Sequence, residues 1–264
     1  MTVPNPDDLD AYGRVLAHAL FPAFEALRGR PTVSLLRELE RTQWLALDEL
    51  RAMQLRGLQR LIAHAHGSTI HYHDVLHERR LAPDDFDALS TLEALPLLDR
   101  ETTVATLEAR TAKVEPRWVI QKSTSGTTGQ PVVVRYNAES RHWRDATRLR
   151  GYGWAGYCVG KRAFHYWGIA PAKDSWLARH KVTLDHALRR DRYVDCTPRS
   201  EAALREAVAE LRRFRPQVIV AYASGIAALA RFVVERDLRD WPEIPVLCGA
   251  ERLWPYDRAV IEQA

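Results

Sequence analysis

Residues 123–131 have the sequence Ser123-Thr124-Ser125-Gly126-Thr127-Thr128-Gly129-Gln130-Pro131, and this stretch decides how the fold is interpreted. Five hydroxyls and two glycines within seven residues are poorly suited to a hydrophobic core. Glycine permits backbone turns in which successive N–H groups converge on an anion. The hydroxyls add hydrogen-bond donors without adding charge. The composition therefore predicts a phosphate-binding loop.

The residues on either side of the loop are typical of strands. Residues 118–120 are Trp-Val-Ile and residues 132–136 are Val-Val-Val-Arg-Tyr, both β-branched or aromatic runs. The segment is therefore strand–loop–strand. A Walker loop has the spacing GxxxxGK[ST] and opens a helix, and this segment does neither. The alternative interpretation is a polar hairpin turn with no ligand.

The rest of the chain predicts an α/β fold. Apolar residues at three- and four-residue steps indicate a helical N-terminal region over residues 1–95. An α/β region follows over residues 96–264, with strands expected at 162–167, 218–221 and 244–248. Helices are expected at 200–213, where Ser200 is the cap, at 224–236, and from Pro255 to the end. Continuous apolar strands joined by helices predict a parallel sheet covered on both faces.

Composition and charge exclude several classes of protein. The chain has 264 residues, of which 46% are hydrophobic and 27% charged, with a net charge of +4. Its arginines are scattered among acidic residues, so no nucleic-acid partner is expected. The longest stretch without charge, residues 216–230, is too short to span a bilayer, so no membrane partner is expected. The N-terminus has no targeting signal. Three isolated cysteines favour a reducing compartment, and the sequence predicts a cytoplasmic protein.

The loop resembles the signature [ST]-[ST]-[GS]-[ST]-T-G-x-P of the adenylate-forming superfamily, which contains the acyl-CoA synthetases. Residues 95–100, 221–224 and 248–253 are similar to further segments of its phenylacetate–CoA ligase-like branch. Arg252 stands where the "G-A-E-P" segment of that branch has proline. The branch also contains capsular-polysaccharide biosynthesis proteins and deazaflavin-adenylylating enzymes.

The resemblance implies a reaction in two steps. A small-molecule carboxylic acid attacks ATP to give an acyl-adenylate, and a thiol such as coenzyme A then takes the acyl group. The implied cofactors are ATP, Mg²⁺ and coenzyme A. The loop, with Ser123, Thr124, Ser125, Gly126, Thr127, Thr128 and Gly129, would hold the β- and γ-phosphates. Gly249, Ala250 and Glu251 would lie along the adenine, although an ordinary strand-to-helix turn is the alternative for these three residues.

Three further residues are candidates for the acyl pocket, namely Tyr136, Tyr222 and Ser224. Tyr136 flanks the loop, and the other two follow a predicted central strand, where ligands of parallel sheets gather. Tyrosines also pack in cores with one satisfied hydroxyl, which is the alternative. The closely spaced histidines of residues 71–77 could bind a metal, but they fit an exposed helix surface better, and no metal site is predicted.

The end of the chain carries a further expectation. The last predicted helix has no terminator, and the resembling family continues past this point with a magnesium-holding Glu, a ribose-binding Asp and a catalytic Lys. None of these is found in residues 1–264, so no catalytic residue is assigned. We expect an N-terminal portion of such an enzyme, either truncated or completed by a second copy or a complementing chain. The alternatives are a non-catalytic nucleotide-binding remnant, or a relative that transfers to a non-thiol acceptor.

Overall fold

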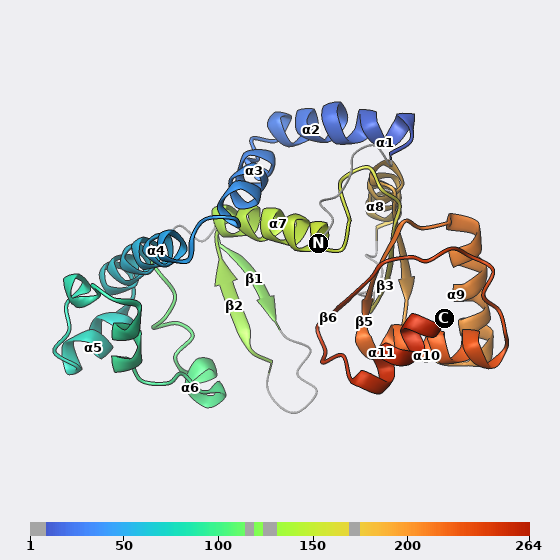
Figure 1. The fold of residues 1–264 in the computed structure, drawn as a ribbon. Coiled ribbons are helices and arrows are strands. Elements are labelled where there is room, and N and C mark those ends of the chain that lie inside the picture. The colour runs from blue at the N-terminus through green and yellow to red at the C-terminus, as the bar shows by residue number, and fades with distance from the viewer. Residues whose placement is uncertain (1–8, 114–118, 124–130, 169–174) are drawn as a thin grey trace. The chain divides into compact units, whose positions relative to one another are not determined.

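The computed structural model describes residues 9–113, 119–123, 131–168 and 175–264 (Figure 1). The chain forms two compact units. One, the sheet unit, consists of residues 1–33 and 147–264, and the other, the hairpin unit, of residues 34–146. None of the helices in the described ranges is long and apolar enough to cross a membrane.

The sheet unit contains four parallel strands: β3 (Ala163–Trp167), β4 (Asp191–Asp195), β5 (Val218–Tyr222) and β6 (Val246–Gly249). Their order across the sheet is β4-β3-β5-β6. Helix α8 (Trp176–Arg189) connects β3 to β4, α9 (Glu201–Phe214) connects β4 to β5, and α10 (Ala223–Glu235) connects β5 to β6. Helix α11 (Pro255–Gln263) follows β6 (Figure 1). This architecture confirms the predicted α/β fold with a parallel sheet.

Both faces of the sheet are covered, as the continuous apolar strands require. On one face, Phe164 and Ile219 pack with the apolar stripes of α9 and α10, including Leu211 and Phe232. On the other face, Ala163 and Val218 pack against Tyr157 and the end of α7 (Ala138–Gly153). Phe164 and Val218 are fully buried. The alternation of strand residues between two cores fixes the register of the whole sheet.

Local signals in the sequence set several element boundaries. The Ser200 hydroxyl accepts a hydrogen bond from the Ala203 N–H at 3.3 Å, which caps α9 as predicted. Pro255 occupies the first turn of α11, also as predicted. The strand expected at 244–248 begins instead at Val246. Pro245 has no N–H to donate, although its carbonyl still accepts from the Ile219 N–H at 2.9 Å.

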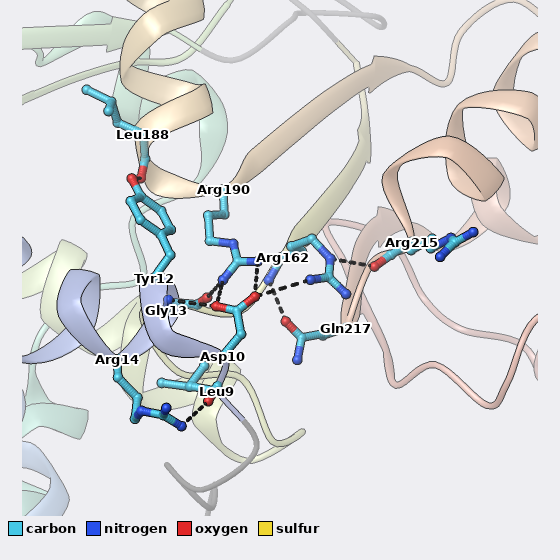
Figure 2. Close-up of polar contacts among 11 residues, drawn as sticks. Leu9, Asp10, Tyr12, Gly13, Arg14, Arg162, Leu188, Arg190, Arg215 and Gln217 are labelled. Atoms are coloured by element: carbon cyan, nitrogen blue, oxygen red, sulfur yellow. Dashed lines mark hydrogen bonds and ion pairs between the residues drawn. The ribbon is translucent and has the colours of Figure 1, made fainter.

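The N-terminal helices α1 (Ala11–Val15), η2 (Leu16–Leu20) and α2 (Phe21–Leu27) belong to the sheet unit. The compact units therefore do not coincide with the predicted division at residue 95. Figure 2 shows the anchor: the Asp10 carboxylate accepts from Arg190 at 2.7 and 2.8 Å and lies 3.8 Å from Arg162. Arg162 also donates to the Arg215 carbonyl, and its own N–H donates to Gln217. The Asp10 carboxylate thus links the segments that precede β3 and β4, and Arg162 connects them to the segment that precedes β5.

The Asp10 anchor predicts a specific dependence of stability on pH. The Arg190 hydrogen bonds, together with the Gly13 N–H, hold the pKa of the Asp10 carboxyl well below its usual range. A carboxyl whose pKa is depressed in the folded state stabilises that state above about pH 4, and the contribution is lost as the pH falls further. We expect Asp10→Asn to lower the free energy of unfolding clearly more at pH 7 than at pH 2, where part of the contribution has already been lost. Urea unfolding of both proteins at each pH measures this difference, and an equal loss at both would contradict it.

The hairpin unit begins with the helices α3 (Thr32–Thr42), α4 (Leu47–Ser68) and α5 (Ile70–Glu78), of which α3 starts in the sheet unit. Two 3₁₀ turns, η3 (Pro83–Asp85) and η4 (Leu89–Ala94), precede α6 (Arg100–Ala105). Ile62, Leu76 and Phe86 form the core of this helical part. The N-terminal region is therefore helical, as predicted.

Strands β1 (Ile120–Ser123) and β2 (Val133–Tyr136) form an antiparallel pair in which Ser123 lies opposite Val133. They flank the predicted phosphate loop, so its strand–loop–strand setting is confirmed. β1 lies slightly later in the chain than the expected 118–120. Arg135 on β2 donates to both carboxylate oxygens of Glu108 at 2.8 and 2.7 Å, which ties the hairpin to the helical part of the unit.

Candidate ligand site at the carboxyl edge of the sheet

The four parallel strands end in a row of residues that we call the carboxyl-edge row: Asp195, Trp167, Tyr222 and Gly249. Trp167 pairs in register with Asp195, and Tyr222 with Gly249. The Trp167 indole stacks on the Tyr222 ring, with centroids 4.1 Å apart and planes inclined by 21°. Two flat aromatic rings thus lie at the edge where parallel α/β sheets bind ligands.

Two glycines allow these rings to lie directly on the backbone. A Cβ atom built on Gly249 would be 3.4 Å from the Trp167 ring, and one built on Gly168 would be 3.4 Å from the Tyr222 ring. Each distance is an ordinary van der Waals contact, so a side chain at either position would lie directly against an aromatic ring. The row therefore combines two half-buried, stacked aromatic rings with glycine backbone, an arrangement suited to a planar ligand.

Polar contacts connect the segments that follow the strands. Ala250 has a φ of +65°, in the left-handed region that residues with a Cβ rarely adopt. Beyond this turn, the Glu251 carboxylate accepts a hydrogen bond from the Ser224 N–H at 2.8 Å. On the opposite side, Arg199 donates to the Cys196 carbonyl at 3.0 Å and to the Ser224 carbonyl at 3.1 Å. The ends of β4, β5 and β6 are therefore joined through Ser224.

The titratable groups at this edge favour binding over nucleophilic catalysis. Burial raises the pKa of the Cys196 thiol, and burial also raises that of Cys248, so both stay protonated and weakly nucleophilic. The Asp195 carboxylate accepts from the Thr197 N–H and hydroxyl, both at 2.9 Å. The described part of this edge supplies rings, peptide groups and hydroxyls that can hold and orient a ligand.

The structure brings together five of the residues singled out from the sequence: Tyr222, Ser224, Gly249, Ala250 and Glu251. Tyr136 lies on β2 in the hairpin unit, where the Arg144 guanidinium is 4.8 Å from its ring centroid. Ser123 ends β1, whereas the predicted phosphate-loop residues 124–129 lie outside the described residues. Sequence reasoning missed Arg199, whose only signal was its position directly before the predicted helix cap Ser200.

The closely spaced histidines of residues 71–77 lie on α5. His73 stacks on His66 with ring centroids 5.0 Å apart, and burial lowers the pKa of His71. Within the described ranges, no group of three or more His, Cys, Asp or Glu side chains is arranged to hold a metal ion.

Two other features of the sheet unit lie away from this edge. His165 is buried, contacts Asp191 at 3.2 Å and stacks on Tyr193, whose pKa burial raises to about 12. These side chains lie within the sheet, below its last row. A cavity of about 750 Å³ opens between β6, α10 and α11, and is lined mainly by apolar core residues such as Ile226 and Val246. Its lining continues the core packed against α9 and α10.

Solved structures of a CoA ligase are similar in fold to this chain. The crystal structure of 2-hydroxyisobutyryl-CoA ligase in complex with 2-HIB-AMP and CoA superimposes with a TM-score of 0.57 at 16% identity, covering 74% of this chain and 41% of that one. An open conformation of the same ligase gives a TM-score of 0.57 at 15% identity. The chain has the fold of an adenylate-forming CoA ligase. The ligase fold is matched over less than half of the solved chains.

Sequence comparison with curated proteins also finds CoA ligases. Phenylacetate-coenzyme A ligase of Aromatoleum evansii is 32% identical over 101 residues, which cover 38% of this chain and 23% of the relative. Phenylacetate-coenzyme A ligase of Escherichia coli (strain K12) is 30% identical over 100 residues, with the same shares. The chain thus matches about a quarter of the length of these relatives. No protein-family model matches it. Sequence and fold together support the adenylate-forming superfamily.

Proposed function

We propose that this chain carries the ATP- and acid-binding part of an adenylate-forming ligase, which activates a small carboxylic acid and transfers it to the thiol of coenzyme A. The carboxyl-edge row carries the proposal, because stacked Trp167 and Tyr222 rings and the bare backbone of Gly249 meet at the ligand-binding edge of a CoA-ligase fold. The phosphate-loop composition of residues 123–129 is the second support.

In this proposal different residues bind different parts of the ligand. The backbone of Gly249 and Ala250 lies along the adenine, and the loop donates N–H and hydroxyl groups to the ATP phosphates, which bring Mg²⁺ with them. Tyr222 and Ser224 face the acyl group, and Tyr136 is the candidate from the hairpin unit. Further partners would be a second copy or a complementing chain, and the reducing cytoplasm suits three cysteines that form no disulfide.

In this reaction the main role of the protein is to position the reactants. A carboxylate oxygen of the acid forms a bond to the α-phosphorus of ATP, and pyrophosphate leaves. The thiol sulfur then bonds to the acyl carbon, and AMP leaves with the electron pair. Negative charge on phosphate oxygens develops in the first step, so fixed donors and correct placement supply most of the catalysis.

ATP–pyrophosphate exchange tests the proposal. We expect the purified chain to bind ATP with Mg²⁺ in calorimetry. Exchange is measured with a complementing chain that supplies the downstream motifs, and we expect it to depend on an added acid, with phenylacetate and 2-hydroxyisobutyrate as the first two probes. ATP binding without exchange for any acid would favour a nucleotide-binding protein without catalysis. Exchange followed by AMP transfer to a hydroxyl, detected by product mass, would identify a non-thiol acceptor. A chain that does not bind ATP would contradict the proposal.

A further inference from the structure

The backbone of Ser224 is held on both sides by charged side chains from other strand ends. The Glu251 carboxylate accepts from its N–H at 2.8 Å, and the Arg199 guanidinium donates to its carbonyl at 3.1 Å. We call these three residues the Ser224 clamp. Arg199 follows β4, Ser224 follows β5 and Glu251 follows β6, so the clamp extends across the sheet at its carboxyl edge.

Glu251 caps the N-terminus of α10, because its carboxylate accepts a hydrogen bond from an N–H group of the first turn. Tyr222 is the N-cap, and it makes no capping hydrogen bond with its side chain. The first N–H groups of a helix lack intrahelical acceptors, and a carboxylate at this end is also favoured by the helix dipole. The acceptor here comes from a residue 27 positions further along the chain. The start of α10 is therefore tied to the end of β6.

Two backbone features bring the residues of the Ser224 clamp together. Ala250 takes the left-handed conformation, with a φ of +65°, and this turn returns Glu251 toward α10. Gly225, directly after Ser224, leaves room for Cys196: a Cβ there would be 3.1 Å from the cysteine Cβ. The first turn of α10 therefore packs against the end of β4, where Arg199 bonds the Cys196 carbonyl at 3.0 Å.

We propose that Glu251 and Arg199 are positioning residues of the candidate site, which fix the Ser224 turn relative to Gly249 and Ala250. The inference rests on the proposed function, because the turn carries the acyl-pocket candidates Tyr222 and Ser224 and the neighbouring segment carries the adenine candidates. It also changes the role of Glu251, which acts on the ligand through the Ser224 N–H instead of touching the adenine. Both charged side chains are exposed, so their loss should alter placement more than global stability.

Conservative and disruptive variants separate positioning from direct contact. AMP is the probe for the adenosine side of the site, and inorganic pyrophosphate is the probe for the phosphate loop. We expect Glu251→Ala to weaken AMP binding about tenfold and to leave pyrophosphate binding unchanged. Glu251→Gln should restore AMP binding, because its amide oxygen still accepts from the Ser224 N–H. Arg199→Ala should behave as Glu251→Ala. Arg199→Lys should not rescue it, since an ammonium lacks the fork that spans two carbonyls.

Amide hydrogen exchange of Ser224, measured by NMR, reports the clamp itself. Exchange should accelerate at least about tenfold in Glu251→Ala and stay unchanged in Glu251→Gln and in the control Glu206→Ala, an exposed glutamate on α9. If Glu251→Gln weakens AMP binding as much as Glu251→Ala, the carboxylate contacts the ligand and the proposal is overturned. If the parent binds neither probe, the proposed function fails, while unchanged Ser224 exchange in Glu251→Ala would overturn the clamp independently.

Discussion

Gly160→Val is expected to destabilise the sheet unit by about 3 kcal/mol or more, because it combines backbone strain with a direct clash. Gly160 has a φ of +102°, which a β-branched residue strongly disfavours. A Cβ at this position would be 2.4 Å from the Gly13 carbonyl oxygen and 3.0 Å from its carbonyl carbon. Both atoms are backbone, so neither can rotate away. Urea unfolding measures the loss.

Two other glycines of the same unit provide matched controls. Gly156 also has a positive φ, +81°, but a Cβ there would meet nothing within 4 Å, so Gly156→Val should show the strain without the clash. Gly151 lies within α7 with equal space around it, and Gly151→Ala should stabilise the unit by about 0.5–1 kcal/mol. If the two valine variants lose equal stability, the packing of α1 against the loop before β3 contributes nothing.

The sequence predicted several elements of this fold, because their signals are local, but it did not predict β4, α7 or α8. Ser200 and Pro255 mark helix starts through their own hydrogen-bonding properties, and a continuous apolar run such as β5 predicts a strand buried on both faces. The two strands beside the phosphate loop were expected for the same reason. Their β-branched residues prefer an extended backbone wherever the chain places them.

The contacts that build the candidate site could not be predicted in this way. Asp10 meets Arg190 across 180 residues, and Glu251 meets Ser224 across 27. Both contacts depend on which strands are neighbours in the sheet. No local sequence pattern predicts the order of the strands. Trp167 ends a predicted strand, and no local pattern shows where its ring lies. Only the register of β3 beside β5 shows that it stacks on Tyr222.

The two edges of the sheet differ in a way that supports the site assignment. At the amino edge, ion pairs and hydrogen bonds around Asp10, Arg162 and Arg190 fix the N-terminal helix, and the groups satisfy one another. At the carboxyl edge, Gly168 and Gly249 leave backbone beside aromatic rings. Parallel α/β sheets bind ligands at the carboxyl edge, which is where the stacked Trp167 and Tyr222 rings lie.

Replacing Ser125 by alanine together with Gly126 by valine is expected to weaken ATP binding by about 100-fold or more, which is the largest functional effect we predict. The two residues lie outside the described residues, so the expectation rests on the composition of the loop. Valine cannot adopt the positive-φ conformations that let successive N–H groups converge on phosphate, and alanine removes a hydroxyl donor. Calorimetric titration with ATP and Mg²⁺ measures the loss.

The same double variant should leave the thermal midpoint nearly unchanged, because polar loop residues between two strands contribute little to the core. Ser140→Ala with Gly67→Ala removes a serine and a glycine from helices α7 and α4 of the same hairpin unit, where no atom lies within 4 Å of a Cβ on Gly67, and it should retain full ATP affinity. Equal ATP affinity in the loop variant and the parent would remove residues 123–129 from the site.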